Sequence, residues 1–121
     1  MSEVGLGCMG LGWSWGDLVS ENDARELLKK AVDKGVNFFD TSDAYGSGYS
    51  ETLLGEAFHA KRHEVIIASK VGVVWNKDGT VKIDLSAKHI NNAIEASLIR
   101  LKTDYIAVSY THLTLPTSDL V

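Results

Sequence analysis

The stretch FFDTSDAYGSGYSETLLGEAF, residues 38–58, decides how this chain folds. It begins inside a short apolar run, residues 36–39, whose β-prone side chains predict a buried strand. Asp40 is the first charged residue after that run, and a turn around Tyr45 leads to Ser50, which is suited to cap a helix. Four apolar residues of this helix are expected to face the interior: Leu53, Leu54, Ala57 and Phe58. The stretch therefore predicts a strand, a polar loop and a helix.

The same unit recurs along the chain. Ser20 and Asp23 match a helix start, and Gly35 supplies a stop signal after Lys34. The predicted elements are a strand at residues 4–6, a helix at 20–34, a strand at 36–39, a helix from 50, a strand at 64–69, a loop around 76–79, a helix from about 86 and a strand from 105. Helical spacing predicts inward positions at Ala24, Leu27, Leu28, Ala31 and Val32 in the first helix, and at Ile90, Ala93, Ile94, Leu98 and Leu101 in the third.

Strands that alternate with helices predict an α/β fold with parallel strands joined by right-handed crossovers. Two architectures satisfy this pattern, an open doubly wound sheet and a β/α barrel. Both place their chemistry at the carboxyl ends of the strands. Asp40 and Lys70 lie at two such ends, each the first charged residue after an apolar run.

The segment GLGCMG, Gly5 to Gly10, matches the letters of the dinucleotide-binding fingerprint G-x-G-x-x-G. Its setting differs, because only four residues precede it and WSWGDLVS, residues 13–20, follows where a helix should begin. A tight passage from strand to loop, in which glycines permit close backbone approach, explains the glycines better. The open dinucleotide-binding sheet stays as an alternative, and it predicts that Asp40 does not pair with Lys70.

Composition excludes several classes of protein. The 121 residues suffice for one domain, and the net charge of -4 comes with no basic stripe, which argues against nucleic-acid binding. No apolar stretch of about 18 residues is present to span a membrane. Cys8 is the single cysteine and no histidine cluster has metal-ligand spacing, so we expect no disulfide and no metal site. A cytoplasmic protein fits these features, and the three histidines before residue 100 are expected to face solvent: His59, His63 and His89.

Several motifs in order resemble the aldo-keto reductase superfamily, whose pattern here is a strand, D-T-x-x-x-Y-G and then S-E-x-x-L-G. The matching segments are GLGCMGLG at 5–12, DTSDAYG at 40–46, SETLLGEA at 50–57 and EVIIASKVG at 64–72. The resemblance covers about Val4 to Ile106. It implies the N-terminal half of a (β/α)8 TIM barrel, truncated after about the fourth strand. It further implies NADPH as cofactor, bound at the carboxyl-terminal face, and reduction of small-molecule aldehydes or ketones.

By the same resemblance, Asp40, Tyr45 and Lys70 match three of the family's four catalytic residues, and His112 falls at the spacing of the fourth. A phenol is a poor acid at neutral pH, and a neighbouring ammonium favours its ionised form. Lys70 is thus expected to make Tyr45 an effective proton donor to the carbonyl oxygen, while Asp40 holds Lys70 charged and aimed. Taken one at a time, the same residues read as a turn residue, a loop aromatic and a solvated strand end.

The loops after the strands supply the other expected site residues. Cys8, Met9 and Asp40 are expected to contact the cofactor, with buried packing as the alternative for Cys8 and Met9. Trp13 and Trp75, together with Tyr45, are expected to wall the substrate pocket; packing over the barrel rim is the alternative for the two tryptophans.

The segment VSYTHLTLPT, which begins at Val108, resembles the translation of a transposon-end adapter used in sequencing libraries. We therefore expect native sequence at residues 1–107 and a non-native tail at 108–121, in which His112 matches the family by coincidence. A barrel needs roughly 200 residues or more, so we expect this chain to be inactive and, because of its open strand edges, unstable or prone to aggregate. The rival functional hypothesis is a cofactor-binding, non-catalytic subunit of the same fold, similar to channel subunits.

Overall fold

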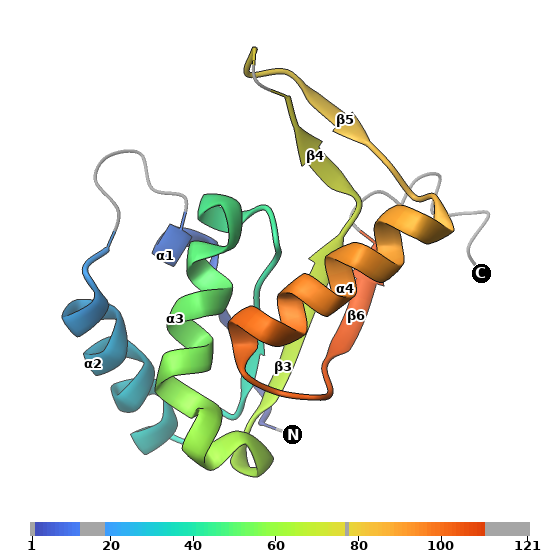
Figure 1. The fold of residues 1–121 in the computed structure, drawn as a ribbon. Coiled ribbons are helices and arrows are strands. Elements are labelled where there is room, and N and C mark those ends of the chain that lie inside the picture. The colour runs from blue at the N-terminus through green and yellow to red at the C-terminus, as the bar shows by residue number, and fades with distance from the viewer. Residues whose placement is uncertain (1, 13–18, 77, 111–121) are drawn as a thin grey trace.

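The computed structural model describes residues 2–12, 19–76 and 78–110. The elements in order are β1 (Leu6–Gly7), α1 (Met9–Gly12), α2 (Glu21–Asp33), β2 (Phe38–Asp40), the 3-10 helix η1 (Tyr45–Gly48), α3 (Tyr49–Phe58), the 3-10 helix η2 (His59–Glu64), β3 (Ile66–Val71), β4 (Val73–Trp75), β5 (Val81–Ile83), α4 (Ala87–Leu101) and β6 (Ala107–Tyr110). Figure 1 shows this succession of strands and helices.

The main sheet contains four parallel strands in the order β1-β2-β3-β6. Within this sheet the strands lie side by side in chain order; the β4-β5 hairpin, which comes between β3 and β6 in the chain, forms a separate sheet. A doubly wound sheet has its first strand in the middle, because the winding direction reverses there. The sequential order is that of a barrel wall. The open dinucleotide-binding alternative is therefore wrong.

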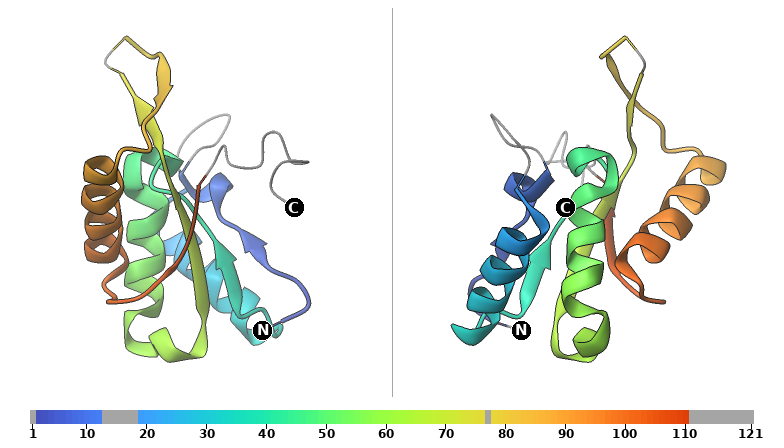
Figure 2. Two further views of the ribbon diagram at one scale, coloured as in Figure 1. Left: turned by 90° about the vertical axis from the view of Figure 1, so that its right-hand side faces the viewer. Right: turned by 60° about the vertical axis from the view of Figure 1, so that its left-hand side comes forward.

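Alternation along the strands separates two faces of this sheet. Phe39 and Ile67 are at most 1% exposed and pack in the hydrophobic core beneath the helices. Ile66, Asp40 and Lys70 fall on the opposite face, where Ile66 is 37% exposed. Figure 2 shows α3 and α4 side by side on one side of the sheet. One face is thus a packed core and the other carries the charged residues.

The helix starts follow the expected signals in two of three cases. Ser20 accepts a hydrogen bond from the Asp23 amide at 3.1 Å, and Ser86 accepts one from the His89 amide at 3.2 Å. The prediction that Ser50 caps the next helix is wrong. That helix begins at Tyr49, after Gly48 with a φ of 99°, and Ser50 lies inside its first turn. The hydroxyl of Ser50 is drawn instead to partners in the core.

The buried faces of the helices differ slightly from the predicted sets of inward-facing residues. Ala24 and Leu28 are buried in α2 as expected, whereas Leu27 is 46% exposed. Helix α2 packs against α3 on one side, and the described residues place no helix on its other side, so the outer edge of the stripe stays in solvent. Helices α3 and α4 approach closely at Gly55, where a side chain would collide with the backbone of Arg100 and Leu101.

A β-hairpin stands where the sequence predicted only a loop. Strands β4 and β5 pair antiparallel and project beyond the main sheet (Figure 1). Gly72, with a φ of 114°, turns the chain from β3 into β4, and Gly79 lies in the tip with a φ of 88°. Each strand is three residues long. Strands so short leave almost no periodic signal in a sequence.

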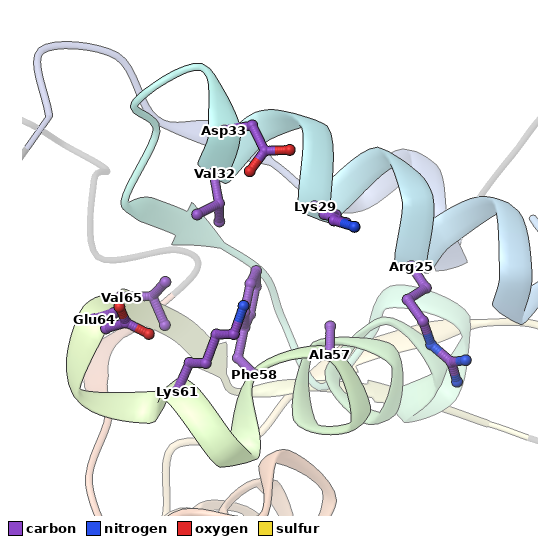
Figure 3. A pocket seen from close by; sticks show the side chains of 9 residues that line it. All are labelled: Arg25, Lys29, Val32, Asp33, Ala57, Phe58, Lys61, Glu64 and Val65. Atoms are coloured by element: carbon purple, nitrogen blue, oxygen red, sulfur yellow. The ribbon is translucent and has the colours of Figure 1, made fainter.

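A cavity of about 150 Å³ lies between α2 and α3, on the helical side of the sheet (Figure 3). Its lining is apolar at Val32, Ala57, Phe58 and Val65, with charged side chains at the rim: Arg25, Lys29, Asp33, Lys61 and Glu64. None of these residues belongs to the group at the carboxyl ends of the strands. The described part of the chain contains no helix long and apolar enough to cross a membrane.

Candidate functional site

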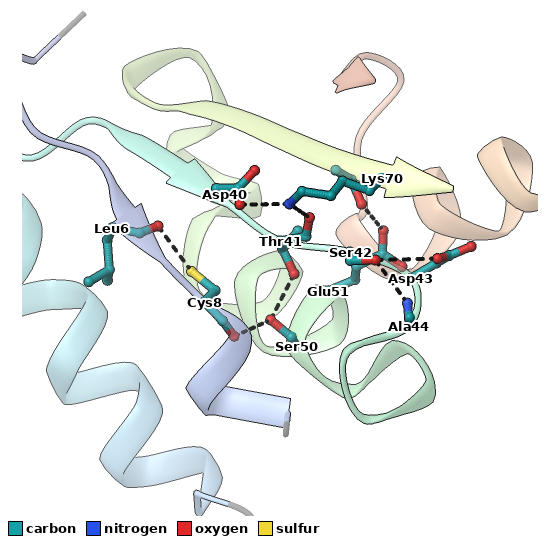
Figure 4. Close-up of polar contacts among 11 residues, drawn as sticks. Leu6, Cys8, Asp40, Thr41, Ser42, Asp43, Ala44, Ser50, Glu51 and Lys70 are labelled. Carbon is teal, nitrogen blue, oxygen red and sulfur yellow. Dashed lines mark hydrogen bonds and ion pairs between the residues drawn. The ribbon is translucent and has the colours of Figure 1, made fainter. Parts of the chain in front are cut away.

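Asp40 and Lys70 form an ion pair at the carboxyl ends of β2 and β3 (Figure 4). The Lys70 Nζ lies 2.6 Å from Oδ2 of Asp40 and donates a second hydrogen bond to the Thr41 carbonyl at 3.0 Å. The parallel register sets Asp40 beside Ala68, so Lys70, two residues on, shares its face of the sheet. The side chains keep 20% (Lys70) and 39% (Asp40) of their surface exposed. The pair is therefore fixed in place and still open to a ligand.

Tyr45 reaches the same place from the loop after β2. The Nζ of Lys70 lies 5.4 Å from the centre of the Tyr45 ring, within the range of a cation–π contact. The loop turns sharply there, because Gly46, Ser47 and Gly48 all have positive φ values. Two glycines take such angles at little cost, while Ser47 is held at a φ of 53°. The structure thus brings Asp40, Tyr45 and Lys70 together.

Buried hydroxyl groups support this site from below. The Thr41 and Ser50 hydroxyl oxygens lie 2.8 Å apart, and Ser50 donates to the Cys8 carbonyl at 3.0 Å. A backbone hydrogen bond joins the same segments, since the Cys8 amide donates to the Asp40 carbonyl at 2.8 Å. These contacts lock the first loop and α3 onto the end of β2. The strand end that carries Asp40 is consequently held from two sides.

The first loop presents its two predicted cofactor residues differently. Cys8 is 1% exposed, and its thiol donates to the Leu6 carbonyl at 3.6 Å. Burial, reinforced by the charge of Asp40 and only partly offset by Lys70, raises the pKa of this thiol to about 12. Met9 is 50% exposed. The Met9 side chain is accessible to a ligand, whereas the Cys8 side chain is part of the packing beneath it.

A buried carboxylate that the sequence reasoning overlooked lies next to this group. Glu51 has no exposed side-chain surface; it accepts from the Ser69 hydroxyl at 2.7 Å and pairs with Arg100 at 2.6 Å. The signal was present in the helix period, because Glu51 shares a face with Leu54 and Phe58, both of which are buried. An acid inside an apolar stripe needs a partner, and α4 supplies one.

Asp43 lies between the ion pairs, on the loop that carries Tyr45. Burial and the nearby charge of Glu51 raise the pKa of Asp43 to about 6, against the opposing influence of Arg100, His89 and Ser42. Its amide donates to the Lys70 carbonyl at 3.2 Å.

His89 differs from its predicted solvent-facing position, since its Nε2 is buried and has no hydrogen-bond partner among the described residues. An open groove of about 410 Å³ runs between the Tyr45 loop, β4 and α4.

Three predicted site residues have no described side chain. Trp13 and His112 lie outside the described residues. Trp75 ends strand β4, but its side chain is likewise not described. Their roles as pocket wall and fourth catalytic residue stay predictions. Among the described residues, no group of three or more His, Cys, Asp or Glu side chains is placed to hold a metal ion.

Comparison with known proteins identifies the family of this chain. Residues 3–120 match the model of the Aldo/keto reductase family. The chain belongs to this family. An uncharacterized oxidoreductase of Bacillus subtilis, YqkF, is 41% identical over 114 residues, which cover 93% of the chain and 35% of that relative. This aldo/keto reductase chain thus spans about a third of the length of the curated relatives it matches.

Solved aldo-keto reductases share the fold. The holo form of AKR11C1 from Bacillus halodurans superposes with a TM-score of 0.78 at 33% identity, over 96% of this chain and 38% of that one. An aldo-keto reductase of Klebsiella pneumoniae in complex with NADPH gives 0.61 at 28% identity, over 84% of this chain and 32% of the other. The prediction of a partial (β/α)8 barrel is confirmed: the parallel sheet and its helices correspond to one part of such barrels.

Proposed function

We propose that this chain is part of an NADPH-dependent oxidoreductase that reduces aldehydes or ketones to alcohols. The observation that carries the proposal is the position of the Lys70 ammonium, held by Asp40 at 2.6 Å and placed 5.4 Å from the Tyr45 ring centre. A charged amine, a carboxylate and a phenol meet where barrel enzymes keep their active sites, at the carboxyl ends of the strands.

The three side chains have distinct proposed roles. Tyr45 donates a proton to the carbonyl oxygen of the substrate. Lys70 stabilises the phenolate that remains, because a positively charged ammonium beside a phenolate lowers its energy, and most where water is scarce. Asp40 and the Thr41 carbonyl keep Lys70 protonated and aimed. The proton is returned to Tyr45 from solvent after the alcohol leaves.

The residues at this end of the sheet fit a nicotinamide cofactor. Met9, two residues after β1, offers a half-exposed apolar side chain, and Asp40 on the neighbouring strand β2 keeps 39% of its side chain exposed. We propose these two as contacts and Cys8 as the buried support below. When bound, the cofactor supplies the hydride that reduces the carbonyl carbon. A related protein, the aldo-keto reductase from Klebsiella pneumoniae, has been solved in complex with NADPH.

The proposal is tested on the full-length protein. Genomic DNA is sequenced through codons 100–121 and onward, the complete reading frame is expressed, and oxidation of NADPH is followed at its absorbance band with a panel of aldehydes and ketones. We expect carbonyl-dependent oxidation that Tyr45→Phe abolishes and that the 121-residue chain alone does not give. Cofactor binding without turnover on any carbonyl would contradict the proposal and favour the non-catalytic subunit.

The same sequencing tests our proposal that residues 108–121 are not native. Strand β6, Ala107–Tyr110, pairs with β3 through backbone groups that any residue offers, so its pairing says nothing about the origin of the sequence. The family match extends over this segment, to residue 120. A genomic sequence that departs from this chain after codon 107 supports the proposal, and a genomic sequence that continues as VSYTHLTLPT overturns it.

A further inference from the structure

The Glu51–Arg100 pair connects β3, which holds Lys70, with the helix that follows the Tyr45 loop. Glu51 lies in the first turn of α3, directly after the loop that carries Tyr45. Its Oε2 accepts from the hydroxyl of Ser69, the residue before Lys70 in β3. Its Oε1 accepts from Nε of Arg100 at 2.8 Å and pairs with the terminal nitrogen at 2.6 Å. One carboxylate thus joins α3, β3 and α4 next to Tyr45 and Lys70.

Arg100 in turn holds the end of the Tyr45 loop. The loop ends at Gly48, and a Cβ there would lie 2.7 Å from both Cδ and Nε of Arg100. The Arg100 side chain therefore packs closely against the backbone at this turn. Asp43, at the other end of the loop, lies close enough for the charges of Glu51 and Arg100 to act on it. Both ends of the segment 43–48 are in this way related to the same ion pair.

A second ion pair, between α3 and the residue that follows α4, provides a comparison. Lys102 Nζ lies 2.7 Å from Glu56 Oε1, and both side chains are more than 40% exposed. An exposed pair contributes little to stability and holds no loop. Glu51, by contrast, is fully buried, and burying a carboxylate is costly unless it is paired and hydrogen bonded. The buried Glu51–Arg100 pair lies where it can fix the geometry of the site.

We propose that Glu51 and Arg100 are positioning residues that fix Tyr45 relative to Lys70. The inference rests on the proposed function, because it concerns the proton donor of that reaction. Neither residue is among those that we propose to contact substrate or cofactor. Their effect is expected in the chemical step, since displacement of a proton donor by about 1 Å can cost about 100-fold in rate.

The test uses four variants of the full-length enzyme: Arg100→Met, Arg100→Lys, Glu51→Gln and, as the matched control, Glu56→Gln. For each we would measure kcat, KM for the carbonyl, Kd for NADPH by fluorescence, and amide hydrogen exchange at residues 43–48. We expect Arg100→Met to lower kcat by about 100-fold with the Kd for NADPH unchanged, and Arg100→Lys to recover part of the loss. Exchange should rise at the Tyr45 and Ser47 amides, which bond to the Ser42 and Ala44 carbonyls. Glu56→Gln should match the wild type.

The possible outcomes separate this inference from the proposed function. A wild type without turnover defeats the proposed function, while the exchange data still show whether the pair holds the loop. A wild type with turnover and a folded Arg100→Met variant of unchanged kcat overturns the inference. An equal loss in Glu56→Gln, or an equal weakening of NADPH binding, also overturns it, because the effect would then be general loosening. If Arg100→Met does not fold, Arg100→Lys and Glu51→Gln decide by the same criteria.

Discussion

The two ends of the sheet each hold a cation, and they hold it differently. At the amino end, Arg62 is 8% exposed and donates to the Thr103 hydroxyl and to the carbonyls of Val65 and Tyr105, at 2.7 to 3.0 Å. Its guanidinium also stacks 3.9 Å above the Tyr105 ring. At the carboxyl end, Lys70 has one carboxylate and one carbonyl as partners and is 20% exposed.

The difference separates a structural cation from a chemical one. Arg62 joins the start of β3 to the segment between α4 and β6, and each of its three side-chain nitrogens donates a hydrogen bond in doing so. Lys70 is aimed by its two partners yet retains a donor and an open side. Barrel enzymes place residues for stability at the amino end of the strands and residues for chemistry at the carboxyl end. Substitution at each end should therefore affect different quantities.

The largest expected effect is on turnover at the carboxyl end. Lys70→Met in the full-length enzyme should lower kcat by about 1000-fold, close to 4 kcal/mol in the activation barrier, because the phenolate of Tyr45 loses its cation. Steady-state kinetics gives the rate, and a thermal melt shows whether the fold survives. Lys102→Met is the control, since Lys102 belongs to an exposed pair. A Lys70→Met enzyme with near-normal kcat would remove the distinction between the two ends.

A smaller effect, and on stability instead of rate, is expected at the amino end. Arg62→Met should lower the free energy of unfolding of the full-length protein by about 3 kcal/mol, because buried carbonyls lose their charged donor. Denaturant unfolding measures this, and kcat of the folded fraction should stay within a factor of about two. Lys61→Met, at the exposed neighbour, is the matched control. If Arg62→Met lowers kcat as much as stability, the amino end also serves the chemistry.

Sequence reasoning captured the carboxyl end better than the amino end. The strand and helix order, the caps at Ser20 and Ser86, and the meeting of Asp40, Tyr45 and Lys70 were predictable because each has a local signal: a period, a cap residue or a motif. Arg62 had none. Its partners Thr103 and Tyr105 lie about forty residues away in sequence, and only the fold brings them together.

Other differences have the same origin. Ser50 carries the letters of a helix cap, but Gly48 and the buried hydroxyl of Thr41 redirect it. The strands of the β4-β5 hairpin are too short to leave a periodic pattern in the sequence. Glu51 was readable as an acid in an apolar stripe, yet the identity of its partner was not, because Arg100 comes from a different helix. Pairing across the fold was predictable where a family motif marks both partners, as for Asp40 and Lys70, and was not predictable where no motif does.

The smallest expected effect is a pH dependence at the carboxyl end, where charge is held at some cost. The pKa of Asp43 rises from an ordinary 3.8 to about 6 in the folded chain, so the folded state binds this proton more tightly than the unfolded state. Stability should therefore fall as pH rises from about 4 to about 6 and then level off. Burial is the largest cause; Glu51 adds to it, and Arg100 and His89 oppose it.

Replacing the acid removes this dependence. Asp43→Asn should gain about 1 kcal/mol over the wild type above pH 6, a figure reduced because the group is only partly shielded from solvent, and little at pH 4. Denaturant unfolding at a series of pH values gives the difference between the two curves, in which all other titrations cancel. Asp78→Asn is the control, because hydrogen bonds from Thr80 lower the pKa of that exposed carboxylate, so its loss should bring no gain. Parallel curves for Asp43→Asn and the wild type would mean that the carboxyl end holds the charge of Asp43 without cost to stability.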